Sequence, residues 1–142
     1  MDKIDKFTGK YRFLSNFYPS VVRVEDTYYA SVEHAYQAYK TNDIAERQPF
    51  ANFKLTAGEA KKLGKKLTLR PYWDEIKDDI MYILILRKFQ NPTLCQSLLE
   101  TGDSELIEGN TWGDTYWGVC QGKGQNKLGK ILMEVRAVYR GR

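Results

Sequence analysis

The longest regular pattern in the sequence runs from Trp73 to about Gln90. Apolar side chains recur there at helical spacing, at Ile76, Ile80, Ile83, Leu84 and Phe89. Apolar residues three and four positions apart line one side of an α-helix, and a helix of this length with such a face needs other elements to cover it. We therefore expect residues 73–90 to form the central helix of the fold.

Shorter helices are predicted before this central helix. Ser31 is a suitable N-cap for a helix over residues 31–40, and Asn42 is suitable as the N-cap of a short helix behind it. Thr56, followed by Glu59, has the spacing of a capping box, in which side chains and backbone amides pair reciprocally. This pair predicts the start of a further helix.

Other patterns complete the expected fold. Pro71 stands at or just before the first turn of the central helix, and residues 92–102 and 122–142 carry the apolar faces of two later helices. Residues 21–29 have the β-branched and aromatic content of a small hairpin. We therefore expect a mainly α, compact single-domain helical fold over residues 1–142, with a small N-terminal β-hairpin element.

The stretch Gly109–Cys120 fits neither a helix nor a strand. It reads GNTWGDTYWGVC, in which aromatic side chains and one carboxylate stand between glycines that interrupt both periods. Large aromatic side chains on a permissive backbone are typical of a shaped surface. We interpret this stretch as one wall of a ligand site.

A polar stripe is predicted on the helix over residues 31–40. Glu33, Gln37 and Lys40 are four and then three residues apart, so they share one face, beside apolar side chains that would pack inward. An ordinary exposed row of polar residues explains the same spacing equally well. His34 points away from this stripe, and we expect it to be structural.

Metal, redox and membrane chemistry find little support. Cys95 and Cys120 lack metal-ligand spacing and His34 is the single histidine, so we expect reduced thiols, no metal and no cofactor. No apolar run approaches the roughly 20 residues of a membrane span, and the first residues lack the pattern of a signal peptide. The expectation is a soluble, cytoplasmic protein without a membrane partner.

The net charge of +4 is modest. A field of this size attracts phosphates, nucleotides or nucleic acid without selecting among them. The densest lysine clusters, at residues 61–66 and 123–130, lie beside apolar residues at helical spacing and fit solvated helix faces.

Three blocks together resemble the signature of a known family. They are FLSNFYPS at 13–20, SVEHAYQAYK at 31–40, and GNTWGDTYWGVC at 109–120 followed by GQNKLGKILMEVR. In this order and spacing the chain resembles the NADAR family of YbiA-like proteins from about residue 7 to residue 136. The resemblance implies a compact, mostly helical fold and hydrolysis of N-glycosidic bonds in ribosylated compounds. The substrate classes it implies are phosphorylated ribosylamino-pyrimidine intermediates of riboflavin synthesis and ADP-ribose attached to guanine.

The resemblance also assigns candidate residues by position. The catalytic candidates are Glu33 and Asp114. The substrate-binding candidates are Arg12, Ser15, Asn16, Lys40, Trp73, Asn110, Trp112, Trp117 and Asn126. The chain departs from the family pattern at Asp26, Ala30 and Tyr72, which bears on substrate preference rather than on the chemistry.

These roles match what the reaction needs. An N-glycosidic bond breaks through an oxocarbenium-like state. A carboxylate beside C1′ stabilises this state and activates water, while another polar group fixes the ribose hydroxyls or protonates the base. Glu33 and Asp114 would supply two carboxylates, the tryptophans would hold the base or exclude water, and Lys40 and Arg12 would bind phosphate. The simpler alternatives are a turn cap for Asp114 and core packing for the tryptophans.

Two other functions stay open at this point. One is a binding module that senses ADP-ribose or NAD without hydrolysis, and the other is a nucleic-acid-binding protein that uses its aromatic and basic side chains. A pure binding site for phosphorylated ligands has little use for added negative charge, so the pair Glu33 and Asp114 favours the enzyme. The expected partner is a small nucleotide-like substrate, with ADP-ribosylated nucleic acid as the alternative.

Overall fold

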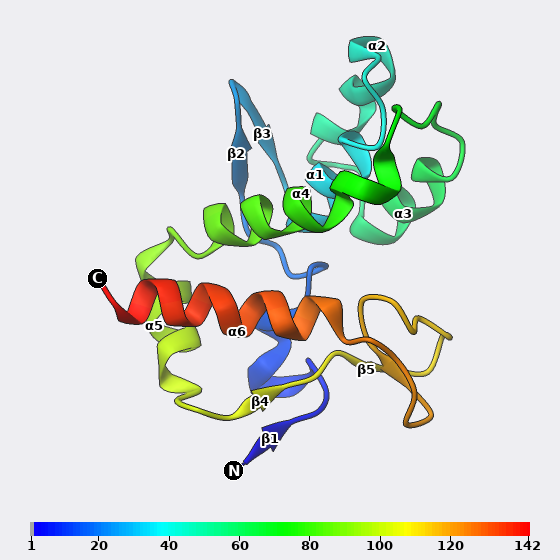
Figure 1. Cartoon of the computed structure of the whole chain (residues 1–142). Coiled ribbons are helices and arrows are strands. Elements are labelled where there is room, and N and C mark those ends of the chain that lie inside the picture. Colours follow the sequence, from blue (N-terminus) through cyan, green and yellow to red (C-terminus); the bar gives the residue numbers. More distant parts are fainter. Residues whose placement is uncertain (1) are drawn as a thin grey trace. The chain divides into compact units, whose positions relative to one another are not determined.

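Residues 2–142 are described in the computed structural model, and their contacts divide the chain into two units (Figure 1). The continuous unit is Asn16–Lys88. The two-segment unit combines the residues up to Ser15 with Phe89–Arg142. Helices supply most of the regular structure in both, so the predicted mainly helical class is confirmed.

The continuous unit begins with a hairpin and continues with helices. Its elements are β2 (Val22–Val24), β3 (Thr27–Tyr29), α1 (Val32–Ala38), α2 (Ile44–Arg47), the 3₁₀ helix η2 (Gln48–Ala51), α3 (Ala57–Gly64) and α4 (Trp73–Lys88). β2 and β3 pair antiparallel with Val22 opposite Tyr29, which confirms the predicted hairpin. Glu25 in the turn has a φ of 57°, in the left-handed region.

Helix α1 is the covered helix of this unit. All its residues are buried, and it packs against α3, α4, η2 and both strands of the hairpin. Ser31 caps it, since the hydroxyl accepts a hydrogen bond from the backbone N–H of His34, as predicted. The sequence pattern placed the longer α4 at the centre, but in this unit α1 holds that place.

The covered side of α4 agrees with the prediction only in part, since Leu84 and the following Phe89 are buried as expected. Its buried residues are Trp73, Met81, Leu84, Ile85 and Lys88. Ile76 and Ile80 are only half-buried, and Ile83 is 45% exposed, so its predicted core position is wrong. At about 100° per residue, Ile83 lies on the opposite side of the helix from the residues two positions before and after it, which are buried.

The start signals of the shorter helices can be compared with the structure. At α3, Thr56 accepts from Glu59 N–H and the Glu59 carboxylate accepts from Thr56 N–H, so the predicted capping box is confirmed. At α2 the N-cap is Asp43 rather than the predicted Asn42, because the Asp43 carboxylate accepts from two amides of the first turn. The predicted cap is wrong by one residue, and both Asn and Asp are favourable N-cap residues.

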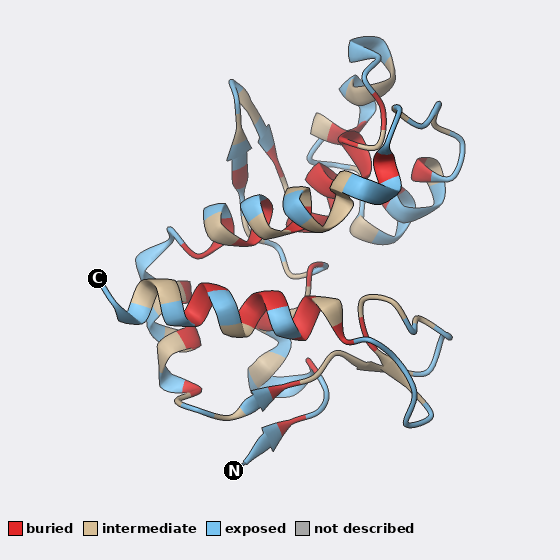
Figure 2. Cartoon of the chain, viewed as in Figure 1, coloured by how far each residue is buried: buried red, intermediate tan, exposed pale blue. Residues whose placement is uncertain are grey.

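The two-segment unit joins both ends of the chain. Its elements are β1 (Lys3–Ile4), the 3₁₀ helix η1 (Gly9–Leu14), α5 (Pro92–Glu100), β4 (Glu105–Leu106), β5 (Gly109–Asn110), β6 (Val119–Cys120) and α6 (Lys127–Arg140). β1 pairs parallel with β4, and β5 pairs parallel with β6. The apolar face of α6 packs on β4 and α5, and Figure 2 shows its buried residues along one side.

A buried arginine ties α6 to the turn behind α5. The Arg136 guanidinium donates to the Thr101 hydroxyl and to the carbonyl of Ser104, both at 2.9 Å. These bonds satisfy groups that would otherwise be buried and unpaired. They fix the turn that leads into β4 and, from there, into the aromatic stretch.

Candidate functional site

Glu33 lies in the first turn of α1 and is only 8% exposed. Its carboxylate accepts a hydrogen bond of 2.6 Å from the side-chain amide of Gln37, one turn further along the helix. Its backbone N–H donates to the carbonyl of Asn16 at 3.1 Å, which ties the start of α1 to the segment before the hairpin. Gln37 is also buried and Lys40 is half-buried, so the interpretation of the stripe as an exposed row is wrong.

Burial dominates the electrostatics of Glu33. Loss of solvent raises the pKa of its carboxyl above the usual value, while the hydrogen bond from Gln37 and the positive charges of Lys61 and Lys40 act in the lowering direction. A carboxyl that holds its proton to higher pH than usual is suited to protonate a leaving group.

Lys40 lies close enough to Glu33 to act on its carboxyl, and two aromatic rings lie next to Lys40. The Lys40 ammonium lies 5.6 Å from the centre of the Tyr36 ring, and the Tyr36 ring centre lies 5.3 Å from that of Trp73. Burial lowers the pKa of Lys40, and the nearby Glu33 opposes this. The structure thus brings three predicted residues, Glu33, Lys40 and Trp73, into one region of the continuous unit. Trp73 is 7% exposed, so its ring is largely occupied by packing.

His34 is held by its neighbours on α1 and beyond. Its Nδ1 lies 2.7 Å from the Ser31 hydroxyl and its Nε2 lies 2.6 Å from the carbonyl oxygen of Leu55. A carbonyl only accepts, so Nε2 carries the proton that binds Leu55. Nδ1 thus contacts the cap of α1 and Nε2 holds the loop before α3, as expected for a structural histidine.

Asp114 caps a turn in the aromatic stretch. Its Oδ1 accepts from the backbone N–H groups of Tyr116 and Trp117, at 3.1 and 2.9 Å. The Asn110 side chain binds both backbone groups of Asp114. Its amide nitrogen donates to the Asp114 carbonyl, and its amide oxygen accepts from the Asp114 N–H. These contacts are those of a turn cap, which was the simpler alternative for Asp114. They use one of its two carboxylate oxygens.

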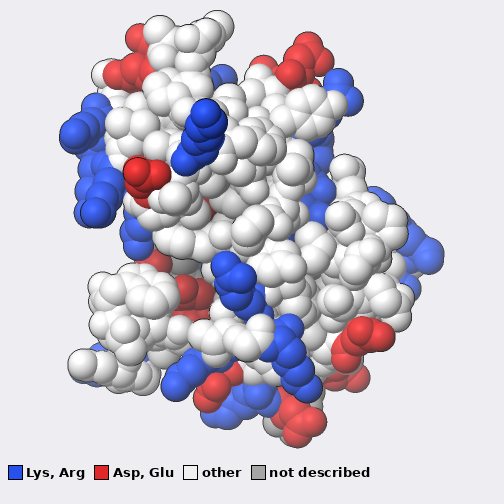
Figure 3. Space-filling view, turned by 180° about the vertical axis from the view of Figure 1, so that it is seen from behind, with Lys and Arg blue, Asp and Glu red and all other residues white. Residues whose placement is uncertain are grey.

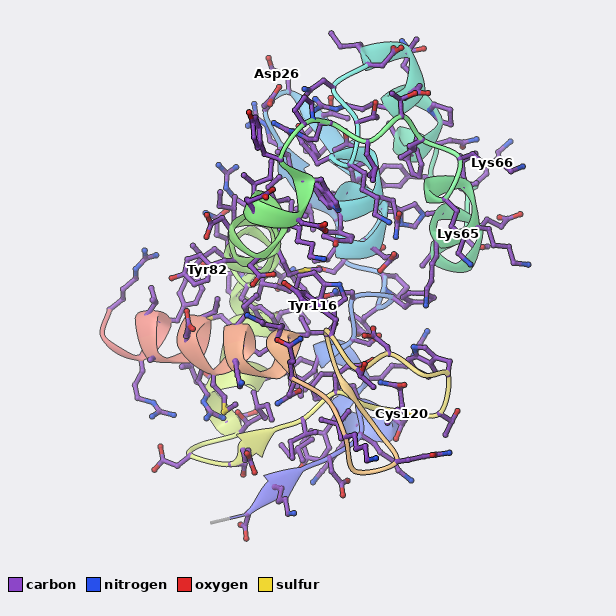
Figure 4. All side chains as sticks on the ribbon, turned by 45° about the vertical axis from the view of Figure 1, so that its right-hand side comes forward. Asp26, Lys65, Lys66, Tyr82, Tyr116 and Cys120 are labelled. Atoms are coloured by element: carbon purple, nitrogen blue, oxygen red, sulfur yellow. The ribbon has the colours of Figure 1, made fainter. Side chains whose placement is uncertain are left out.

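The two tryptophans of this stretch differ in exposure. Trp112 is 62% exposed. Trp117 is half-buried and meets the Tyr116 ring edge to face, with ring centres 4.9 Å apart. Figure 4 shows Tyr116 near the start of α6, where its carbonyl accepts from Lys127 N–H. Trp112 is therefore the more accessible of the two side chains, and Trp117 contributes to packing.

Asn126 and Glu108 build the base of the stretch. Asn126 has a φ of 53°, and its side-chain amide bridges two backbone groups by donating to the carbonyl of Leu106 and accepting from the N–H of Glu108. The Glu108 carboxylate accepts in turn from the Asn110 amide at 3.0 Å. The sequence analysis did not predict that Glu108 supports this stretch. Its position two residues before Asn110 was the signal that could have indicated it.

The first sequence block is distributed over both units. Arg12 and Ser15 lie in and directly behind η1 of the two-segment unit, and Arg12 is exposed. Asn16 lies in the continuous unit and is 8% exposed. Its amide nitrogen lies 3.5 Å from the Met81 sulfur, and its Oδ1 has no hydrogen-bond partner among the described residues.

A separate hollow lies beside the hairpin. It encloses about 370 Å³ and is lined by Glu25, Tyr29, Tyr39 and Arg47 among others. The Arg47 guanidinium stacks 4.1 Å from the centre of the Tyr39 ring, and burial raises the pKa of Tyr39 to about 12. None of the predicted site residues lines this hollow.

Two further properties of residues 2–142 bear on the expected partners. Over this range, no cluster of three or more His, Cys, Asp or Glu side chains is arranged to hold a metal ion. No helix in the same range combines the length and apolar character needed to cross a membrane. Figure 3 shows basic and acidic side chains interspersed over the face that it presents.

The family of the chain follows from comparison with known proteins. Residues 5–140 match the NADAR domain, so this chain belongs to the NADAR family, as its sequence blocks indicated. The match spans both units of the structure.

Named relatives and a solved structure agree with this assignment. An N-glycosidase of Nostoc punctiforme is 41% identical over 92% of this chain and 86% of its own length. The N-glycosidase YbiA of Escherichia coli is 33% identical over 89% of the chain and 80% of its own length. A riboflavin biosynthesis protein of Vibrio vulnificus is 38% identical over 87% of the chain, which corresponds to 34% of that larger protein. The NMR structure of E. coli YbiA superimposes with a TM-score of 0.87 at 31% identity, covering 99% of this chain and 86% of that one.

These findings confirm the predicted family and the predicted YbiA-like fold. The predicted enzyme class agrees with the names of the relatives. The roles of the individual site residues, and the organisation of residues 1–142 as one domain, stay predictions.

Proposed function

We propose that this chain is an N-glycosidase that hydrolyses the bond between ribose C1′ and a nitrogen of a nucleotide-like substrate. The observation that carries the proposal is the buried carboxyl of Glu33 in α1, in a chain of the NADAR family whose relatives are named N-glycosidases. Burying an ionisable carboxyl costs stability, and such a cost is common where the group performs chemistry.

Glu33 is the proposed general acid or base of the reaction. As C1′ loses its bond to nitrogen, positive charge develops on the sugar and negative charge on the departing base. The raised pKa of Glu33 favours the protonated form that a leaving base needs. Once it has given up this proton, the carboxylate stabilises the positive sugar and accepts a proton from water.

Asp114 is the proposed second carboxylate. Its Oδ1 is fixed by two backbone N–H groups, which sets the direction of the remaining oxygen. A turn cap and a catalytic group are compatible, because a fixed carboxylate is pre-organised for charge stabilisation.

The binding residues divide by chemistry. Lys40 and Arg12 are proposed to bind phosphate, and Trp112 is proposed to stack on the base through its exposed ring. Asn16 Oδ1 is an acceptor that a ribose hydroxyl would satisfy. The remaining candidates, Ser15, Trp73, Asn110, Trp117 and Asn126, are proposed to shape and support the surfaces on which these groups act.

The proposed substrate is a phosphorylated ribosylamino-pyrimidine, because a relative of this chain is named a riboflavin biosynthesis protein. ADP-ribose attached to guanine, free or in nucleic acid, is the competing substrate. We also propose a cytoplasmic location.

Base release decides between these functions. The purified protein is incubated with a ribosylamino-pyrimidine phosphate, NAD, ADP-ribose and guanine-ADP-ribosylated DNA, and the products are followed by mass spectrometry. We expect free base from the first substrate and at least about a hundredfold slower release by Glu33→Gln, because a positioned acid or base contributes that much. Tight binding without product would instead indicate a sensor. Salt-dependent DNA binding without product would indicate a nucleic-acid-binding protein.

A further inference from the structure

Gln37 is a buried side chain with one satisfied and one unsatisfied group. It is 4% exposed, and its amide nitrogen donates to Glu33 Oε2 at 2.6 Å. Its Oε1 has no hydrogen-bond partner among the described residues. A buried acceptor without a partner loses the hydrogen bond that water gave it in the unfolded chain. The amide is therefore held by its bond to Glu33, at the cost of an unsatisfied oxygen.

The end of α3 provides the space that this amide occupies. α1 and α3 pack together, and Gly64 is buried at the last position of α3. A Cβ atom built on Gly64 would overlap Gln37 Oε1 and come within 2.7 Å of its Cδ. Glycine is a poor helix former, so a side chain at this position would favour the helix itself. The absence of a side chain at Gly64 leaves room for the amide of Gln37.

We propose that Gln37 is a positioning residue for Glu33, and that Gly64 keeps the space in which its amide sits. The inference rests on the proposed role of Glu33 in N-glycoside hydrolysis. A glutamate side chain has several rotatable bonds, and the hydrogen bond from Gln37 restricts the carboxyl to orientations within reach of that amide. The amide donates to the ionised carboxylate, and after rotation its oxygen can accept from the protonated one. Gln37 thus serves Glu33 in both protonation states.

Other charged groups around Glu33 are few. Lys61 of α3, His34 of α1 and Lys40, two residues after the end of α1, act on its carboxyl. Lys77 of α4 acts on Lys40. The 3₁₀ helix η2, with the sequence QPFA, has no ionisable side chain. The hairpin strands carry Arg23, which pairs with Asp26 in solvent, and Thr27, Tyr28 and Tyr29. The hydrogen bond from Gln37 is the largest influence that lowers the pKa of Glu33, so its removal has a direct readout.

Two variants test the proposal in the full-length protein. Gln37→Met removes the amide and keeps an unbranched side chain, whereas Gly64→Ala leaves Gln37 in place and takes its space. Gly58→Ala is the matched control, because it lies in the same helix and its Cβ would meet only Thr56 Oγ1 at 4.0 Å. The titration of Glu33 is followed by ¹³C NMR of labelled glutamate, with the signal assigned from its loss in Glu33→Gln, and kcat and KM are measured on the substrate that releases base.

The expected results separate positioning from stability. In Gln37→Met and Gly64→Ala the midpoint of the Glu33 titration moves to higher pH, and kcat falls about tenfold with KM little changed, as for loss of one hydrogen bond to a charged group. Gly58→Ala leaves both quantities at the wild-type values. An unchanged midpoint and kcat in Gln37→Met would overturn the proposal, even if Gly64→Ala fails to fold. Absence of base release by the wild-type protein would refute the proposed function, while the NMR midpoint would still decide the role of Gln37.

Discussion

Lys88 makes the stability of this protein depend on pH in a defined direction. It lies at the end of α4 with 1% of its surface exposed, and its ammonium lies 5.8 Å from the centre of the Tyr18 ring. Burial lowers its pKa from 10.5 to about 7. Lys88→Met keeps an unbranched side chain and removes the titrating amine. We expect the stability difference between this variant and the wild-type protein to change with pH.

The magnitude follows from the two pKa values. Above 10.5 the amine is neutral in both the folded and the unfolded chain, so the proton has no effect on stability. Between 10.5 and about 7 the unfolded chain binds a proton that the folded chain does not, and the free energy of unfolding falls by about 1.4 kcal/mol for each pH unit of acidification. Below about 7 both states carry the proton, and the loss levels off at roughly 5 kcal/mol.

Urea denaturation between about pH 7 and about pH 9.5 measures this effect. The advantage of Lys88→Met over the wild-type protein should grow by about 1.4 kcal/mol per unit as the pH falls. The matched control is Lys66→Met, because Lys66 is exposed and directed outward from the end of α3 (Figure 4). This control makes the same side-chain change at the protein surface. A constant difference for Lys88→Met over the same range would refute the reasoning.

Three further changes test the site residues. Glu33→Gln should be at least as stable as wild type at neutral pH, because burial raises the pKa of Glu33 and ionisation therefore opposes folding. This advantage of the variant should shrink as the pH falls toward 4.5. Thermal melts at both pH values measure the difference. Asp114→Asn should keep the fold, since an amide oxygen can accept the same two backbone N–H groups, but it should release base at least about a hundredfold more slowly; a wild-type rate would leave Asp114 as a turn cap only. Trp73→Ala should weaken binding of the base and also lower the melting temperature, because the ring is buried against Tyr36; unchanged affinity in a binding titration would exclude a contact with the base.

Local signals in the sequence predicted local structure well. The caps at Ser31 and at Thr56 with Glu59 were identified because a cap involves only residues three positions apart. The hairpin was identified from two short β-branched and aromatic runs around a turn. The family blocks led to Glu33, and the structure shows its carboxyl buried in α1.

Features that depend on distant residues were not predictable in this way. Ile83 is as apolar as the buried Leu84 and Ile85 beside it, so composition could not show which side of α4 would be covered. The parallel pairing of Lys3 with Glu105 joins two-residue strands, which have no periodicity to read. Gln37 was placed on the correct face, but its link to Gly64 appears only when α1 and α3 pack.

The division of the chain has a consequence for the order of folding. The continuous unit, Asn16–Lys88, has its contacting elements within one stretch of chain, so none of its internal contacts has to wait for a later part of the chain. The strand at Lys3 and Ile4 must wait for Glu105 and Leu106, since it has its pairing partner there. Lys3 and Ile4 are thus synthesised well before the strand with which they pair.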